Sequence, residues 1–418
     1  MGGFRSSAGF AVIVLTAMNL LNYIDRWVPS AVKPLFQHDL GLTDEQTSLP
    51  LTAFILVYML ASPIFGTLAE RGRRPVIIAA GVAIWSLATA AGALATGFYT
   101  FLAARALVGV GEAAYATIAP ALIADHYEPA RRNKVLTLFY VATPVGAALG
   151  FVLGGSLGHH YGWRTAFLAV GLPGLVVAAI ALLLPDPPRG RFDDVKQVPP
   201  PWPAALRALR NNPRYLFTVA GYVFVSFAIG GIGDWFPTLL FRDRGFPLED
   251  AGAIAGQATV VGGLVGTILG GVIAEALVKR GIKEAYLWTS ALSLVPAIAF
   301  AVVALYVADT RMEALASIAL CQVFLWMYNG PVNALLVNSV GPGMRTRAFA
   351  LSIFAIHAFG DALSPPIIGK VSSMTGSLPF AIGLVLLALV VAVVIWTVGG
   401  TRLGATQPSP ETPDAAAP

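Results

Sequence analysis

The chain has 418 residues, of which 56% are hydrophobic and only 12% are charged, with a formal net charge of +5. Soluble domains carry about 25% charged residues, whereas long and nearly uncharged stretches recur here from end to end. The sequence therefore excludes a soluble protein with a single anchor and indicates an integral membrane protein. The small positive excess, without a separate basic domain, gives no indication of nucleic-acid binding.

Twelve segments are long and apolar enough to cross a membrane, which takes about 20 residues in a helix. We therefore predict an all-α membrane protein. The predicted spans are Phe10–Val32, Thr47–Ala69, Pro75–Ala95, Phe98–Ile123, Val135–Leu157, Trp163–Leu184, Tyr215–Leu239, Ala251–Val278, Ala285–Val307, Ala314–Val340, Ala348–Ser372 and Leu378–Val398. The single cysteine, Cys321, lies inside one of them, and is expected to be a small buried hydrophobe without a disulfide or metal partner.

Basic residues predict the orientation. If the N-terminus is inside, the cytoplasmic segments hold 19 Lys and Arg residues, beginning with Arg5, and the outside segments hold six, including Lys33. Both termini are therefore predicted to be cytoplasmic, in what we take to be a bacterial inner membrane.

The only long loop, residues 185–214, divides the spans six and six. We predict an N-terminal half at 1–184, a cytoplasmic linker at 185–214, a C-terminal half at 215–400 and a disordered tail at 401–418. The linker contains Pro199 and neighbouring prolines, and then Trp202, Leu206 and Leu209 on one side of a short helix. Such a helix suits a membrane surface, and an ordinary linker is the alternative.

The two halves repeat short patterns in the same order. Gly66-x-x-Ala69-Glu70 matches Gly271-x-x-Ala274-Glu275, and Trp27-x-Pro29 matches Trp235-x-Pro237. Two parallel six-helix halves are typical of transporters, which hold their substrate between the halves near the membrane midplane.

Five ionisable residues within the spans have no counterpart in the other half: Asp25, Arg26, Glu112, His357 and Asp361. Ionisable groups at membrane depth are costly and usually mark a substrate or ion pathway. Asn22 shares a helix face with Asp25 and Arg26, and Arg105 lies two turns from Glu112 on one side of the fourth span. A static network of ion pairs is the alternative.

Desolvation pushes a buried carboxylate toward its neutral form, and a nearby Arg pushes it toward its charged form. We therefore predict that Asp25, Glu112 and His357 carry protons. The predicted substrate-binding residues are Arg26, Arg105, Asn22, Tyr115, Asn329 and Asp361, since the cations suit an anionic headgroup.

The predicted cytoplasmic loop after the second span contains Glu70, Arg71, Arg73 and Arg74. Such a cluster can hold helix ends of the two halves together in one state and release them in another. Simple positive-inside anchoring also explains the arginines.

The twelve spans, the repeat and Gly66–Arg74 resemble the major facilitator superfamily, although Glu70 replaces the usual Asp and the loop is one residue short before Gly72. More narrowly, the chain resembles the spinster family of lysolipid and sphingolipid transporters. This resemblance rests on Arg105–Asp125, Phe139-Tyr140 with Pro144-x-Gly146, Asp186–Gly190 and His357–Pro365.

The resemblance implies alternating access and an amphipathic lipid substrate with a phosphate headgroup. It also implies coupling and substrate roles for Asp25, Arg26 and Glu112, a cavity position for His357, and a monomer. Our leading hypothesis is a proton-coupled lipid transporter that is not an enzyme and needs no cofactor. A drug or organic-anion carrier, or a lipid-modifying membrane enzyme, are the alternatives.

Overall fold

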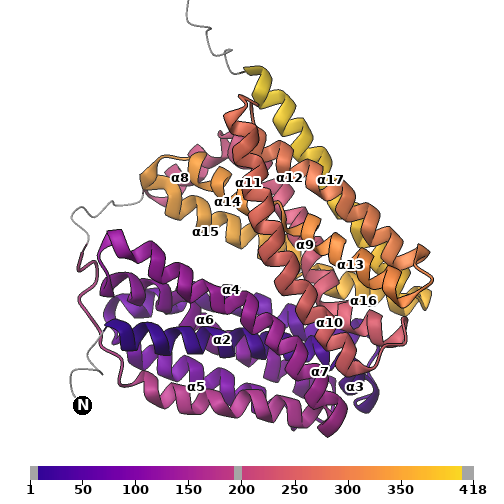
Figure 1. The fold of residues 1–418 in the computed structure, drawn as a ribbon. Helices are drawn as coiled ribbons and strands as arrows, with labels where there is room; N and C mark the ends of the chain where they lie inside the picture. The colour runs from indigo at the N-terminus through magenta and orange to yellow at the C-terminus, as the bar shows by residue number, and fades with distance from the viewer. Residues whose placement is uncertain (1–7, 193–199, 407–418) are drawn as a thin grey trace, which may run out of the picture. The chain divides into compact units, whose positions relative to one another are not determined.

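The computed structural model describes residues 8–192 and 200–406, and these residues are almost entirely helical, without a strand (Figure 1). The expectations that concern Arg5, Pro199 and residues 407–418 fall outside this range. Helices of the first part are α2 (Ala8–Ala31), α3 (Lys33–Asp39), α4 (Asp44–Arg71), α5 (Arg74–Gly92), α6 (Phe98–His126), α7 (Pro129–Ala181) and α8 (Trp202–Arg210).

The later spans are interrupted helices. They comprise α9 (Pro213–Arg242), α10 (Leu248–Val261), η1 (Gly262–Gly266), α11 (Thr267–Lys279), α12 (Ala285–Val302), η2 (Val303–Val307), α13 (Arg311–Trp326), α14 (Asn329–Asn338), η3 (Pro342–Met344), α15 (Arg345–Ile356), η4 (His357–Asp361), α16 (Ser364–Thr375) and α17 (Leu378–Thr406). Three π-helical turns, η1, η2 and η4, lie within membrane-spanning stretches. π-turns inside helices are frequent at functional sites, and η4 contains His357 and Asp361.

Eleven helical stretches of the described chain have the length and composition of membrane spans, against twelve predicted. The difference lies in α7, whose 53 residues would extend about 80 Å as one helix, far more than one crossing needs. Gly162 breaks α7 with a φ of 81°, a conformation that glycine adopts without steric cost. The stretch therefore contains the predicted fifth and sixth spans.

Two compact units divide the chain: residues 1–197, 226–260 and 357–385 form the first, and residues 198–225, 261–356 and 386–418 form the second. This division does not follow the predicted boundary at 185–214, and the six-plus-six repeat stays a prediction. Helix α17 continues to Thr406, so the segment predicted as a tail from residue 401 begins as helix.

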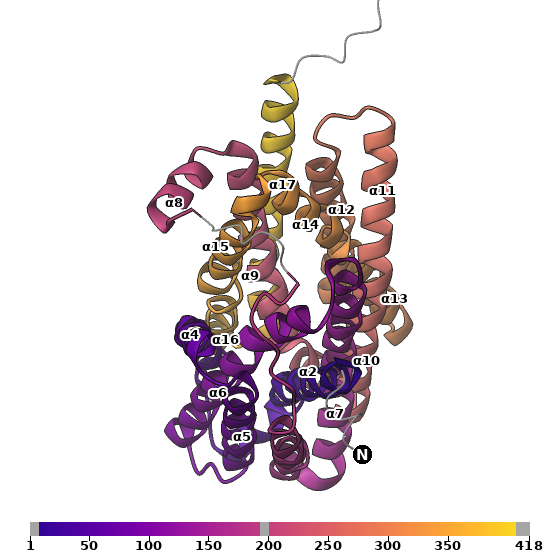
Figure 2. The same cartoon turned by 90° about the vertical axis from the view of Figure 1, so that its left-hand side faces the viewer.

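In the first unit, α4, α5 and α6 lie side by side (Figure 2). Glycines allow their backbones to touch: a Cβ on Gly111 would lie 2.4 Å from the Gly81 carbonyl oxygen, and one on Gly109 would lie 2.5 Å from that of Phe54. In the sequence, Gly109 and Gly111 indicate such a close approach, and the structure confirms it. It excludes lipid from the helix face that carries Arg105 and Glu112.

Parts of the chain's later spans also belong to the first unit. A Cβ on Gly252 of α10 would lie 2.4 Å from the Phe151 oxygen of α7, and one on Gly369 of α16 would lie 2.5 Å from the Asp44 oxygen of α4. Segments predicted to belong to opposite halves are thus in direct backbone contact at these points.

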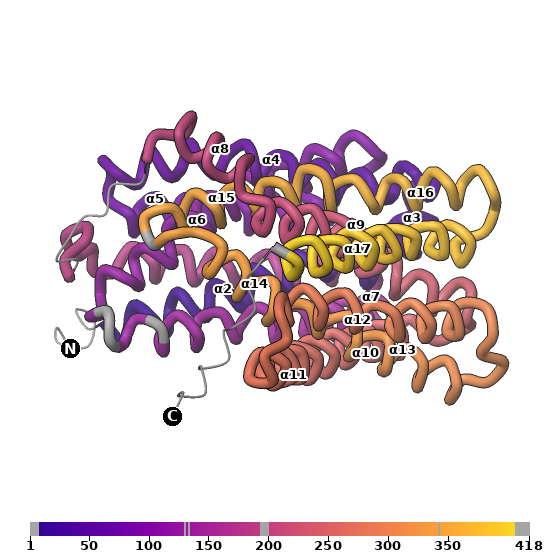
Figure 3. Tube along the Cα trace, turned by 90° about the horizontal axis from the view of Figure 1, so that it is seen from above, coloured from indigo at the N-terminus to yellow at the C-terminus, as the bar shows by residue number. Residues whose placement is uncertain are grey.

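The second unit contains α8 and α11–α15, with α11, α12 and α13 side by side (Figure 3). The short helix predicted in the linker is present as α8. Its buried residues are Ala205 and Leu209, while Trp202 is partly exposed and stacks under the Arg347 guanidinium at 4.1 Å. The position of α8 on a membrane surface stays a prediction.

Candidate functional site

Arg26 of α2 reaches across to α6, where its Nη2 lies 2.6 Å from Glu112 Oε2. Glu112 is fully buried. The guanidinium is surrounded by aromatic rings, with its carbon 4.9 Å from the ring centres of Tyr23 and Phe54 and 5.5 Å from that of Tyr58. Such cation–π contacts gain strength where water is excluded, so the rings stabilise the charged guanidinium.

Asp25 has different partners from its neighbour. Arg105 Nη1 lies 3.5 Å from Asp25 Oδ1, and the Thr89 hydroxyl of α5 donates to Asp25 Oδ2 at 2.5 Å. Asp25 and Arg26 therefore do not pair with each other. Each is joined to a separate residue of α6, because successive helical side chains point in directions about 100° apart.

Several buried polar atoms of this cluster have no hydrogen-bond partner among the described residues. They are Asn22 Nδ2, Arg26 Nε and Glu112 Oε1, together with Asp25 Oδ1 and Arg105 Nη1, which face each other as an ion pair at 3.5 Å. Buried polar groups are nearly always hydrogen-bonded, and each exception needs an explanation. The cluster thus keeps donors and acceptors that can serve a ligand or a proton.

A third ion pair, which the sequence reasoning missed, joins Lys33 to Asp234 of α9. Both side chains are buried, the Ser30 hydroxyl donates to Asp234 Oδ1 at 2.8 Å, and the Lys33 ammonium lies 4.0 Å from the Trp235 ring centre. Lys33 was counted as a loop residue because it follows the last apolar residue of its span. Its pairing with Asp234 becomes visible only in the structure, where Lys33 begins α3 and its side chain is buried.

The three cations line one narrow cavity of about 10 Å³, which has room for about one water molecule. Its lining includes Arg26, Ser30, Lys33, Thr47, Arg105 and Asp234, with Pro29, Phe36, Pro50, Leu51 and Phe101 supplying apolar walls. Each cation is paired with one carboxylate, so the set of six charged groups is neutral when all are ionised. An anion that enters this low-dielectric space adds one uncompensated charge, which is costly unless a proton or cation enters with it.

His357 and Asp361 form a pair of their own on η4, with His357 Nδ1 2.9 Å from Asp361 Oδ2. Helix α9 lies against this turn, since a Cβ on Gly230 would lie 2.3 Å from that of Asp361. The Thr52 hydroxyl of α4 donates to the Ala362 oxygen at 2.7 Å. Both side chains are about one quarter exposed, and so remain accessible to solutes.

The other predicted substrate-binding residues are placed differently. Tyr115 is buried in the apolar core, and its hydroxyl donates to the Leu15 oxygen at 2.7 Å, which suits packing. Asn329 belongs to the second unit, where its Nδ2 donates to the Thr267 hydroxyl at 3.3 Å. The structure therefore does not place Tyr115 among groups free to bind a ligand.

Cys321, which was expected to be buried, is free and half-buried.

Within the predicted cytoplasmic cluster only Arg74 is buried, whereas Glu70, Arg71 and Arg73 are exposed. Arg74 pairs with Asp125 at the end of α6, and its Nε lies 2.7 Å from Asp186 Oδ1 after α7. These contacts lie inside the first unit. They tie three helix ends together, and the four residues thus do not form one cluster.

Arg189 adds a second connection at the same place, donating from Nη2 to the Ala69 and Gly72 oxygens at 2.7 and 2.6 Å. Asp125, Asp186 and Arg189 had not been assigned a role in the sequence. A basic residue directly after an apolar span usually indicates positive-inside anchoring. Its acidic partners are distant in the chain, so the sequence does not identify them.

At the other end of the first unit, Asp44 at the start of α4 meets Arg242 at the end of α9. Arg242 Nη1 lies 2.9 and 3.0 Å from the two Asp44 oxygens, and the Ser372 hydroxyl of α16 donates to Asp44 Oδ2 at 2.5 Å. These contacts join segments predicted to belong to different halves, on the predicted outer side.

The connection after α3 is held by an exposed pair, Asp39 with Arg164. Hydrogen bonds from Arg164 and then from Trp163, whose Nε1 lies 3.0 Å from Asp39 Oδ2, hold the pKa of Asp39 below its usual value. A lowered carboxyl pKa gives stability that is present above the ordinary value and lost as the pH falls through the lowered one. Exposure keeps this contribution small.

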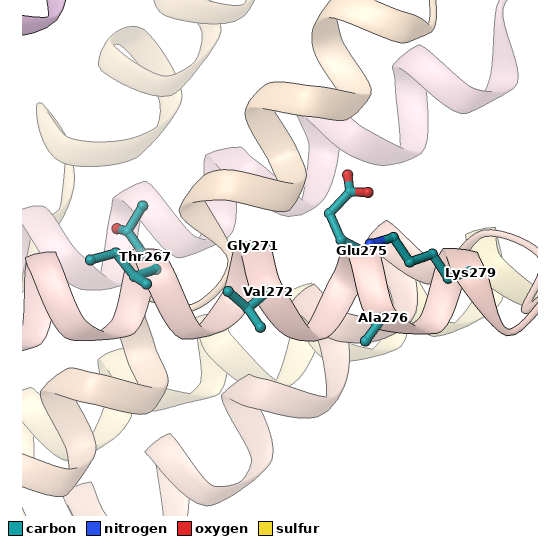
Figure 4. Close-up of a pocket in the computed structure, with 7 residues that line it drawn as sticks. Thr267, Gly271, Val272, Glu275, Ala276 and Lys279 are labelled. Carbon is teal, nitrogen blue, oxygen red and sulfur yellow. The ribbon is translucent and has the colours of Figure 1, made fainter.

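In the second unit a shallow groove runs along one helix, α11. It is lined by Thr267, Ile268, Gly271, Val272, Glu275, Ala276 and Lys279 (Figure 4). Ile268 and Val272 are exposed apolar side chains, as expected on a surface that faces lipid. The buried charges and unpartnered polar atoms of the first unit are absent from this lining, so we do not take it as the candidate site.

Comparison with known proteins places these features in context. Residues 15–365 match a family model described as Major Facilitator Superfamily. Spinster of Drosophila melanogaster is 33% identical over 375 residues, which cover 88% of this chain and 62% of the relative. Spinster homolog 1 of Homo sapiens is 34% identical over 384 residues, which cover 86% and 72%. The chain thus spans less than two thirds of the Drosophila protein.

Two solved structures share the fold. A bacterial homolog of the human lysosomal transporter spinster, in an inward-facing and unoccupied conformation, matches with a TM-score of 0.85 and 24% identity over 97% of this chain and 99% of that one. A D-xylose–proton symporter matches with a TM-score of 0.72 and 16% identity over 93% and 98%. At these identities the likeness concerns the fold alone.

Proposed function

Since the chain belongs to the major facilitator superfamily and, within it, to the spinster family, we propose that this transporter couples proton movement to the transport of an amphipathic lipid anion. The substrate class is a lysophospholipid or sphingolipid with a phosphate headgroup. The protein acts as a monomer in a bacterial inner membrane, with both termini in the cytoplasm and the lipid and the proton as its partners.

One observation carries this proposal, namely the neutral set of three cations and three carboxylates in the first unit. Arg26, Arg105 and Lys33 are paired with Glu112, Asp25 and Asp234. Protonation of one carboxylate leaves the set with a net positive charge and frees a guanidinium to bind an anionic headgroup. Release of the headgroup restores the original pairing and returns the proton.

Glu112 is the carboxylate best placed for this exchange. It is fully buried, its only cation is the partly exposed Arg26, and its second oxygen has no partner among the described residues. Asp25 differs in having two partners, Arg105 and Thr89. We assign proton loading to Glu112 and headgroup binding to Arg26.

Transport into reconstituted vesicles with an imposed pH gradient tests the coupling. We expect uptake of a lysophospholipid to follow the gradient in the wild type and to lose that dependence in Glu112→Gln, which cannot ionise. Glu128→Gln, the same change at an exposed loop residue, serves as the control. Uptake that ignores the gradient in wild type and Glu112→Gln alike would overturn the coupling.

The substrate class is tested separately by competition. A lysophospholipid should slow labelled uptake and raise the Tm of the purified protein, while small hydrophilic anions should do neither. If small hydrophilic anions slow uptake and raise the Tm while a lysophospholipid does neither, an organic-anion carrier is favoured. Detection of a chemically altered lipid after incubation would favour a lipid-modifying enzyme.

A further inference from the structure

A second cluster of potential ligand groups lies outside the site described above. His159 and His160, near the end of the first crossing of α7, meet Glu249 at the start of α10, with one ligand atom from each residue within 4.8 Å of the others. We propose that these three residues bind a divalent cation of the Zn²⁺ class, and that the bound ion clamps α7 to α10.

The side chains are already close to a coordinating arrangement. The two imidazole rings are 4.9 Å apart between centroids, and His160 Nδ1 lies 4.0 Å from Glu249 Oε2. Zinc takes nitrogen and oxygen ligands at about 2.0–2.2 Å, which places tetrahedral ligand atoms about 3.4 Å apart. Both histidines are exposed, so small rotations of their rings can bring the ligand atoms to this spacing at low cost.

Two hydrogen bonds prepare the ligands. His160 Nδ1 lies 2.9 Å from the Ser156 oxygen. With the proton on Nδ1, Nε2 is the ligand atom, and the His160 ring turns to bring Nε2 toward Glu249 in place of Nδ1. The Ser156 hydroxyl donates to Glu249 Oε1 at 3.4 Å. Support of a ligating histidine by a backbone carbonyl, and of a ligating carboxylate by a hydrogen bond, is the usual outer-shell arrangement of metal sites.

The backbones beneath the cluster are in close contact in this structure. A Cβ on Gly155 of α7 would lie 2.9 Å from the Leu248 oxygen, and one on Gly158 would lie 3.3 Å from a Leu248 side-chain carbon. All of these residues belong to the first unit. The distance between the histidines and Glu249 is therefore set by helix packing.

Binding of the divalent cation affects transport, and this step of the inference rests on the proposed function. Helices α7 and α10 belong to opposite predicted halves, and their ends here are predicted to face outside. Opening a transporter to the outside separates these ends, so an ion that bridges them stabilises the closed arrangement. External Zn²⁺ is then an inhibitor, acting through a site distinct from the substrate cavity.

Calorimetric titration of the purified full-length protein with Zn²⁺ tests the site without any transport assay. We expect one ion per chain, an increase in Tm, and at least about tenfold weaker binding in His159→Ala, His160→Ala and Glu249→Gln. Asp250→Asn and His38→Ala, exposed residues outside the cluster, should bind as the wild type does. Equal binding by the three ligand variants and the wild type would overturn the site.

Vesicle uptake with Zn²⁺ added outside tests the clamp. Wild-type uptake should fall and Glu249→Gln uptake should not. If Zn²⁺ binds but leaves wild-type uptake unchanged, the clamp is wrong. If the vesicles take up no lysolipid at all, the proposed function fails, while the titration still decides whether the metal site exists.

Discussion

Arg26 and Asp25 are sequence neighbours, yet each is held by a different residue of α6. The sequence pointed to both, because charges are costly within an apolar span. It did not assign their partners, since Glu112 and Arg105 are separated from them by about 80 residues of chain. The aromatic rings around Arg26 were not predicted for a functional role either, because tyrosine and phenylalanine in an apolar helix usually signal packing alone.

The Arg26–Glu112 pair gives a direct prediction for stability. Removing one member of a buried ion pair leaves the other uncompensated and typically costs about 3–5 kcal/mol. We expect Glu112→Gln and Arg26→Gln each to lower the free energy of unfolding by an amount near the lower end of this range, since Arg26 is partly exposed. The double variant should lose clearly less than the sum of the two.

Denaturation of the three variants in detergent measures this coupling. Gradient-driven uptake of lysolipid should be lost in all three, because either change removes the proton carrier or the headgroup ligand. Additive losses of stability would show that the two residues do not interact.

Arg74 connects the ends of several helices, a role that its position in the sequence does not indicate. Arg74 begins α5, and joins it to the end of α6 through Asp125 and to the segment after α7 through Asp186. Its location near Arg71 and Arg73 suggested one functional cluster. The three arginines differ in burial, because the Arg74 side chain is buried whereas Arg71 and Arg73 are exposed.

Replacement of Arg74 should therefore destabilise the first unit. Arg74→Met leaves two acids without their cation, and we expect a loss of about 3–5 kcal/mol in the free energy of unfolding. Arg73→Met, at the exposed neighbour, should stay within about 0.5 kcal/mol of the wild type. Denaturant titration of both variants checks this, and equal effects would mean that Arg74 acts only as a topogenic charge.

Over the whole molecule, contacts between segments of the predicted halves lie on the predicted outer side of the first unit. Asp44 with Arg242 and Ser372, and Lys33 with Asp234, join α3 and α4 to α9 and α16. If the halves move apart during transport, these polar contacts must break together. The cavity lined by Arg26 and Thr47 lies beside them.

Weakening this contact should make the cavity easier to reach from outside. We expect Asp44→Asn to speed the labelling of a Thr47→Cys probe, in a Cys321→Ser background, by a membrane-impermeant maleimide. A loss of about 1.4 kcal/mol from the closed state corresponds to about a tenfold higher rate. Glu45→Gln, at the exposed neighbouring acid, is the control, and an unchanged rate in Asp44→Asn would contradict this gating role.

The sequence by itself determined the membrane class, the spans and most of the unusual charges. These follow from local properties: the length of apolar segments, the cost of a charge in hydrocarbon, and glycines that allow close helix approach. The fold class is confirmed by the helices and by the family match. The substrate, the coupling and the roles of individual residues stay predictions.

Only the tertiary structure decided which charges meet. Lys33 looked like a loop residue and proved to be a buried partner of Asp234, while Tyr115 proved to pack in the core with a satisfied hydroxyl. The sequence assigned no ligand role to His159 or Glu249, which come together because α7 and α10 touch through glycines. Ion pairs and ligand clusters depend on how helices cross, and a crossing between distant segments leaves no periodic mark along the chain.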